Sequence, residues 1–157
     1  MRNERVLLLI QASLGGGLAG CGLSHGGVVF MPLGLSLLWS VCRSPLAGSL
    51  WGVIALLVSH RWLLALHPLS WIGVPVPLSL PITIAIWLFC GGFAGLLVGT
   101  WSCFGNWIIS RDCFEGCIKE KFSYALVMAC LWGLAEVALA RSPLFWIGVG
   151  GSLLPGD

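Results

Sequence analysis

Long uncharged runs separated by short charged segments dominate this chain, and that pattern predicts helices that cross a membrane. Arg61 is the only formally charged residue between Ser44 and Ser110, a stretch too long and too apolar for the core of one soluble domain. A transmembrane helix needs about 20 predominantly apolar residues. The sequence therefore predicts an all-α integral membrane protein, with residues 1–157 forming a single bundle of about five helices. The expected spans are residues 6–23, 28–41, 46–66, 82–104 and 122–140.

The second expected span decides the topology. Residues 28–41 number only 14 and include Pro32, so by length alone they could form a re-entrant or interfacial segment instead. Cytoplasmic loops carry an excess of Lys and Arg. If all five segments cross from a cytoplasmic N-terminus, six of the eight Lys and Arg residues lie inside, and only Arg61 and Arg141 lie outside. Without the second crossing the division is four to four, so the charges favour five spans and a periplasmic C-terminus.

The amino-acid composition further narrows the class of protein. Hydrophobic residues make up 58% of the chain and charged residues 9%, whereas charged residues are about 25% of an ordinary globular domain. The formal net charge of +2 is too small and too scattered for a nucleic-acid-binding surface, which needs a clustered basic patch. Residues 1–24 have the basic start and apolar run of a signal peptide but no clean cleavage pattern, so we expect them to remain as the first span.

Two of the segments that connect the expected spans differ in charge and in proline content. Residues 106–121 hold most of the interior charge, and we expect a solvated cytoplasmic loop there rather than a short amphipathic turn on the membrane surface. Residues 67–81 carry four prolines and several large apolar side chains, including Trp71, but no formal charge. Proline breaks helices and removes backbone donors. We therefore expect this segment to rest in the outer interface or to cover a cavity.

Glycine spacing predicts how the helices pack. Gly91, Gly95 and Gly99 recur every four residues in the fourth expected span, and Gly16 and Gly20 do so in the first. Small residues on one helix face let helix backbones approach closely in lipid. No Gly-Lys-Ser/Thr sequence follows them, which excludes a phosphate-binding loop.

Cysteine and histidine patterns indicate no metal and no cofactor. The seven cysteines are spread over the spans and one polar loop, and Cys113 and Cys117 lack the second pair or nearby histidine that a zinc site needs. His60 and His67 are seven residues apart at one edge of the membrane, whereas a single heme takes axial ligands from opposing sides. Histidines at an interface are usually polar tips beside apolar surface, and heme or pigment binding is kept only as an alternative.

Glu136 is the one acid inside an expected span. Ionisable residues within a membrane face the bundle interior or water and mark functional positions, although pairing with Arg61 or Arg141 would give Glu136 a purely structural role. We expect a side chain that faces inward. The sequence has no Ser/His/Asp set, paired carboxylates or Cys/His/Glu cluster at catalytic spacing, so we assign no catalytic residue.

A series of short motifs resembles the N-terminal membrane part of bacterial apolipoprotein N-acyltransferase. The resemblance covers about Ser44 to Asp157. The segments rich in Pro, Trp and Gly are most similar to those of cyanobacterial members. Residues 6–41 are consistent with it but unspecific. The motifs are Leu50-Trp51-Gly52, Arg61-Trp62, Gly73-Val74-Pro75, the glycine-rich fourth span, Leu131-Trp132-Gly133-Leu134-Ala135-Glu136 and Pro143-Leu144-Phe145-Trp146.

This resemblance implies an enzyme of the bacterial inner membrane that moves an acyl chain from a phospholipid to the N-terminal amine of a diacylated lipoprotein cysteine. In that family a periplasmic nitrilase-like domain supplies a Glu-Lys-Cys triad and forms a thioester acyl-enzyme. The sequence stops at Asp157, before that domain, so no triad residue is carried over. Cys90 and Cys130 occupy apolar mid-span positions, where a thiolate is disfavoured. We expect either a truncated or split product with a separate catalytic polypeptide, or an inactive membrane remnant.

Six residues are candidates for shaping a lipid or substrate cavity in such an enzyme, and they combine aromatic rings with isolated charges. A different class stays open, namely a small non-enzymatic membrane subunit that binds pigment or heme or forms a structural or transport bundle. The inverted repeats of many transporters are not apparent. The six candidates are Arg61, Trp62, Trp71, Trp132, Glu136 and Trp146.

Overall fold

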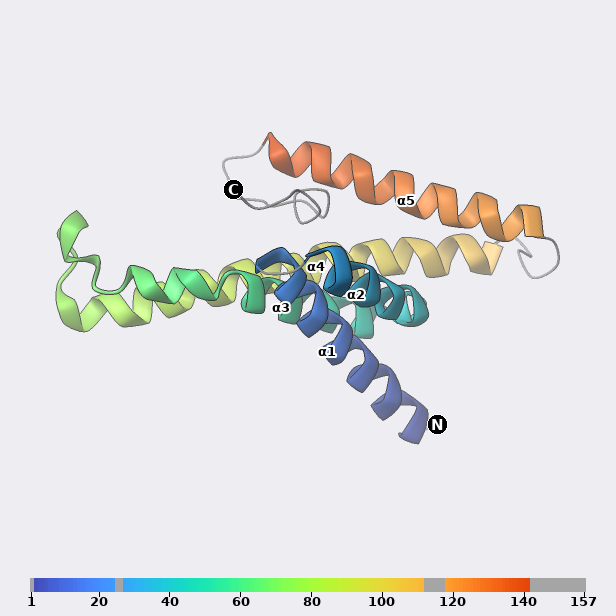
Figure 1. Cartoon of the computed structure of the whole chain (residues 1–157). Coiled ribbons are helices and arrows are strands. Elements are labelled where there is room, and N and C mark those ends of the chain that lie inside the picture. The colour runs from blue at the N-terminus through green and yellow to red at the C-terminus, as the bar shows by residue number, and fades with distance from the viewer. Residues whose placement is uncertain (1, 25–26, 112–117, 142–157) are drawn as a thin grey trace.

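Helices make up nearly all of the chain that the structure, a computed structural model, describes: residues 2–24, 27–111 and 118–141. No strand occurs among these residues, so the predicted all-α membrane fold is confirmed. Figure 1 shows the arrangement. The elements are α1 (Arg2–Ser24), α2 (Gly27–Val41), α3 (Pro45–Ser59), the 3-10 helices η1 (Arg61–Leu66) and η2 (Leu69–Ile72), α4 (Val76–Arg111) and α5 (Ile118–Ala140).

Three helices of the described chain, α1, α4 and α5, are long and apolar enough to cross a membrane. The other two, α2 and α3, are apolar but have only 15 residues each. With its 36 residues, α4 is unusually long. At about 1.5 Å per residue it measures roughly 54 Å, whereas the hydrocarbon core of a bilayer is about 30 Å thick. In a membrane α4 must therefore tilt or extend beyond the hydrocarbon at its ends.

The third expected span is not a continuous α-helix. Ser44 caps the start of α3, because its hydroxyl accepts a hydrogen bond from the backbone N–H of Ala47 at 3.4 Å. The α-helix ends at Ser59, and the chain continues as the tighter helix η1. His67 is then extended, with ψ 134°, as expected for a residue that precedes proline.

Much of the proline-rich segment, residues 67–81, is helical. Its last residues belong to α4, which begins at Val76. Pro77 fits the first helical turn because the N–H that proline lacks would have no partner there. Ahead of it, η2 ends at Ile72 and is followed by Gly73, whose φ of 81° lies in a region that glycine enters without steric cost.

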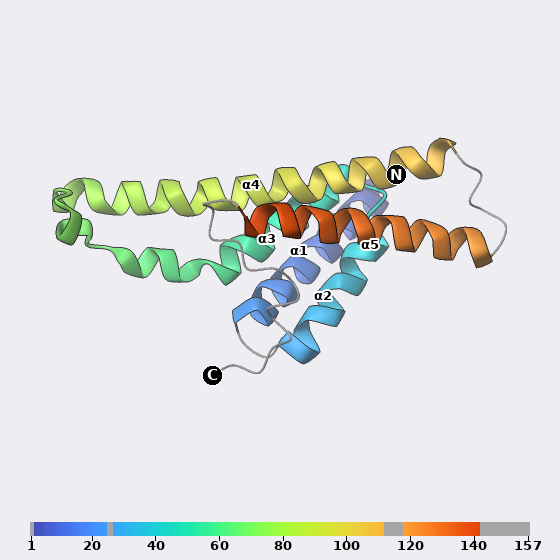
Figure 2. The same ribbon diagram turned by 90° about the horizontal axis from the view of Figure 1, so that it is seen from above.

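Ser79 lies in the first turn of α4, and its hydrogen bonds hold the preceding segment against that helix. The Ser79 hydroxyl is fully buried, accepts a hydrogen bond from the Leu69 N–H at 2.7 Å and lies 2.9 Å from Nδ1 of His67. Its backbone carbonyl also accepts a bond from the Thr83 hydroxyl at 2.8 Å. The turn between α3 and α4 is therefore held by polar contacts under an apolar exterior, and it forms one end of the molecule in Figures 1 and 2.

Glycines bring the helix backbones together. A Cβ atom added at Gly52 of α3 would lie 2.7 Å from the carbonyl oxygen of Ala94 in α4, and one at Gly16 of α1 would lie 2.5 Å from that of Trp51. Such distances leave no room for a larger side chain. The two glycine series identified in the sequence thus lie at helix interfaces, since Gly91, Gly95 and Gly99 all face α3 and Gly16 and Gly20 also do so.

The core lies where α1, α2 and α3 meet and α4 packs against them, and α5 contributes no residue to it. Figure 2 shows α5 running beside α4, and of its residues only Tyr124 and Met128 are buried. Most of the α5 surface would therefore face lipid or another protein segment. The core residues are Ala12, Ala19, Met31, Leu38, Val41, Ala47, Trp51, Ala55 and Val98.

Candidate functional site

A row of aromatic rings joins four helices. Trp132 of α5 makes edge-on contacts with Trp51 of α3 and Trp101 of α4, at ring-centroid distances of 6.4 and 5.5 Å. Trp39 of α2 extends the row, with its ring centroid 6.5 Å from that of Trp101 and 5.6 Å from that of Tyr124. Edge-on aromatic pairs stabilise a fold beyond the apolar area they bury. The row therefore ties the loosely packed α5 to the rest of the bundle.

Each indole N–H at the centre of this row has an acceptor. Trp51 donates to the carbonyl of Gly34 at 3.0 Å, and Trp101 donates to the carbonyl of Met128 at 2.9 Å. Both bonds cross between helices. Trp132 donates instead to Oε1 of Glu136, one turn further along α5, at 2.8 Å. Because an unpaired polar group is costly in an apolar environment, these bonds fix the orientation of the three rings.

A cavity of about 410 Å³ opens beside the row, between α2, α4 and α5. Its walls are apolar apart from one carboxylate. Ligand-binding pockets have volumes of about 300–1,000 Å³ and are mostly apolar with a few polar groups. This cavity can thus hold part of an acyl chain or a comparably apolar group. It is lined by Leu35, Leu38, Trp39, Trp101, Ala129, Trp132, Gly133 and Glu136.

Glu136 is the polar group of this cavity. Its side chain is half-buried and also borders two smaller spaces, one between α4 and α5 and one that reaches toward α1 and α3. The inward orientation expected for this acid agrees with that placement. A carboxylate at an apolar wall can accept hydrogen bonds from a polar group that enters with an apolar chain.

The other candidate residues that the structure describes do not line this cavity. Arg61 and Trp62 belong to η1 and Trp71 to η2, so all three are in the turn between α3 and α4, and none of them belongs to the aromatic row. All three side chains are exposed, Trp71 at 71% and Trp62 at 47%. Trp146 lies outside the described residues. Of the five candidates that the structure describes, Trp132 and Glu136 therefore meet at the cavity, whereas Arg61, Trp62 and Trp71 lie in the turn.

The two histidines that the structure describes, His60 and His67, make polar contacts within the fold. Nδ1 of His60 lies 2.8 Å from the hydroxyl of Ser59, and Nδ1 of His67 lies near Ser79. Within the described part of the chain, no group of three or more His, Cys, Asp and Glu residues is arranged to hold a metal ion.

The sequence did not identify four members of the row as site residues: Trp39, Trp51, Trp101 and Tyr124. Trp51 enters the sequence analysis only within the Leu50-Trp51-Gly52 motif. The available signal was the number of tryptophans, nine in 157 residues. That number shows aromatic enrichment, but it does not show which rings from four different helices meet.

Comparison with known proteins finds relatives that share one name and align with all 157 residues of this chain. The chain is 60% identical over its 157 residues to an apolipoprotein N-acyltransferase of Prochlorococcus marinus strain MIT 9313. It is 48% identical to that of Parasynechococcus marenigrum strain WH8102 and 46% identical to that of Prochlorococcus marinus strain SARG, again over 157 residues.

These alignments cover 100% of this chain but only 32 or 33% of each relative. The chain therefore spans about a third of the length of the curated relatives it matches. No protein-family model matches it, and no solved structure does.

Proposed function

We propose, from the premise that the chain belongs along its whole length to the apolipoprotein N-acyltransferases, that it forms the N-terminal membrane part of such an enzyme and handles lipid for it. The reaction of the complete enzyme would transfer an acyl chain from a phospholipid to the N-terminal amine of a lipoprotein cysteine. The observation that carries this proposal is similarity over all 157 residues to proteins of that name.

The cavity beside the aromatic row supports a role in lipid handling. It combines apolar walls with a single carboxylate, and it borders α5, the helix that packs least tightly against the others. A lipid chain entering beside α5 would exchange bilayer for a surface of indole rings and aliphatic side chains. Trp132 and Glu136 are the residues that we expect to contact it. The amphipathic Trp132–Glu136 pair offers both an apolar ring and a hydrogen-bond acceptor.

Arg61, Trp62 and Trp71 would act at the membrane boundary. Trp and Arg side chains at helix ends hold apolar parts in lipid and polar parts at the headgroups. The turn that carries these three residues is exposed and contains large apolar side chains. We propose that it rests in the outer interface, where Arg61 contacts phospholipid headgroups.

The orientation follows from the distribution of Lys and Arg. We propose a multi-pass protein of the bacterial inner membrane with its N-terminus in the cytoplasm and its C-terminus in the periplasm. In a cysteine-free background, a membrane-impermeant maleimide added to spheroplasts should label Arg61→Cys but should label Arg43→Cys only after permeabilisation. The reverse labelling pattern would contradict this orientation.

We assign no catalytic step to residues 1–157. We propose that the 157-residue chain alone, mixed with a diacylated lipoprotein and phospholipid vesicles, gives no N-acylation. Co-expression with the remaining two-thirds of the Prochlorococcus marinus MIT 9313 relative should restore transfer, because the chain would supply the missing membrane part. Mass spectrometry of the lipoprotein N-terminal peptide measures the result, and acyl transfer by the 157 residues alone would refute the division of roles.

A further inference from the structure

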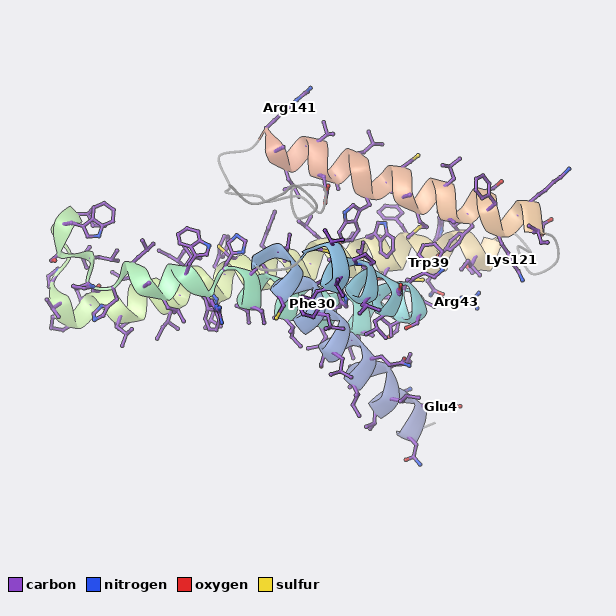
Figure 3. The ribbon with its side chains drawn as sticks, in the orientation of Figure 1. Glu4, Phe30, Trp39, Arg43, Lys121 and Arg141 are labelled. Carbon is purple, nitrogen blue, oxygen red and sulfur yellow. The ribbon has the colours of Figure 1, made fainter. Side chains whose placement is uncertain are left out.

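A second cavity, of about 670 Å³, lies where the ends of α2 and α4 meet the start of α5. It differs from the first cavity in carrying positive charge. Arg43 follows α2 and Lys121 lies in the first turn of α5, and Figure 3 shows both near Trp39 at this end of the molecule. The cavity is lined by Trp39, Cys42, Arg43, Ile109, Lys121, Tyr124 and Ala125.

Both cations are available to a ligand. Their side chains are exposed at the rim, and among the described residues neither forms an ion pair with a carboxylate. The inner wall of the cavity is neutral. Burial raises the pKa of the Cys42 thiol, although a hydrogen bond with Tyr124 and the charge of Arg43 oppose that shift. A protonated thiol adds no negative charge, so the field in the cavity favours an anion.

Trp39 connects this basic cavity with the apolar one, because its ring lines both. A ligand that fits the pair needs a compact anionic group at one end and an apolar chain at the other. A soluble anion would fill the basic cavity but leave the apolar surface beyond Trp39 without a partner. An anionic phospholipid has both parts in the required order.

We propose that Arg43 and Lys121 bind the phosphate of an anionic phospholipid whose acyl chain passes Trp39 and enters the cavity beside Trp101 and Trp132. Arg and Lys bind phosphate oxygens through charge-assisted hydrogen bonds. The ring of Trp39 stands at the boundary between the polar and apolar parts of the lipid. This site does not require the chain to take part in acyl transfer, and it would serve to hold α5 against α2 and α4.

The test is a binding measurement on the purified 157-residue chain in an uncharged detergent. Dioctanoyl phosphatidylglycerol, dioctanoyl phosphatidylcholine and inorganic phosphate are titrated separately, and native mass spectrometry counts bound molecules. We expect one tightly held phosphatidylglycerol. Arg43→Gln and Lys121→Gln should each weaken its binding about tenfold, because each loses a charge-assisted hydrogen bond. Lys121→Arg should retain binding, since it keeps the charge and the donors.

Lys119→Gln is the matched control. It removes the same charge from the same turn of α5, but Lys119 does not line the cavity, so affinity should change less than about twofold. Equal losses for Lys119→Gln and Lys121→Gln would show attraction to a charged surface and overturn the site. Binding of inorganic phosphate as tight as that of phosphatidylglycerol would overturn the assignment to a lipid, and phosphatidylcholine binding equally well would overturn the requirement for an anionic lipid.

Discussion

Gly52→Val should markedly weaken the packing of α3 against α4. The Cβ atom of the new side chain would lie 2.7 Å from the carbonyl oxygen of Ala94 and 2.8 Å from Cγ2 of Val98. One of these neighbours is backbone, so relief requires the two helices to separate along their contact. Overpacking of a close interface costs roughly 1–3 kcal/mol, and we expect a value at the upper end. Unfolding by SDS in mixed micelles, followed by circular dichroism, measures the loss.

Gly92→Val is the control for this prediction. Gly92 lies on α4, and a Cβ atom there would meet nothing within 4 Å. The same change in backbone entropy and volume therefore occurs without a clash. We expect the free energy of unfolding to change by about 0.5 kcal/mol or less, the usual range for exposed positions. If Gly92→Val destabilised the protein as much as Gly52→Val, close backbone approach would not be what stabilises the pair.

Trp132→Ala should release α5 from the bundle. This side chain contacts both Trp51 and Trp101 and donates a hydrogen bond to Glu136. Replacing a buried Trp or Phe by alanine costs about 3–5 kcal/mol, and we expect the lower end because Trp132 is only half-buried. The measurement is proteolysis in detergent, in which the variant should be cleaved between α4 and α5 faster than the unmodified chain.

Two further variants separate packing from hydrogen bonding at this position. Trp132→Phe keeps an aromatic ring against Trp51 and Trp101 but loses the N–H that reaches Glu136, so its proteolysis should be intermediate. Leu134→Ala shortens a side chain of the same helix that is 68% exposed, and it should leave the rate unchanged. Protection of α5 in Trp132→Ala equal to that in the unmodified chain would show that the aromatic row does not fasten this helix.

Local patterns in the sequence predicted much of the bundle. Apolar runs located the helical segments, and the spacing of Gly91, Gly95 and Gly99 identified a face that contacts α3. Both features repeat along one helix and need no knowledge of the partner. The inward position of Glu136 followed from the cost of placing a carboxylate against lipid.

The sequence did not reveal how the proline-rich segment folds or which aromatic rings meet. Pro77 is expected to break a helix, yet it lies in the first turn of α4, because the first turn of a helix tolerates proline. Burial of Ser79 beneath the segment depends on contacts that no local pattern specifies. Likewise, Trp39 and Tyr124 are 85 residues apart in the sequence, and only the packing of α2 against α5 places their rings together.

We propose that this chain supplies the membrane part of an apolipoprotein N-acyltransferase. The most direct measurement replaces the matching third of the Prochlorococcus marinus MIT 9313 relative by residues 1–157 and produces the chimera in cells that lack their own N-acyltransferase. Mass spectrometry then determines how many acyl chains the N-terminal cysteine of a lipoprotein carries. We predict triacylated lipoprotein. A chimera that inserts and folds but leaves the lipoprotein diacylated would contradict the claim.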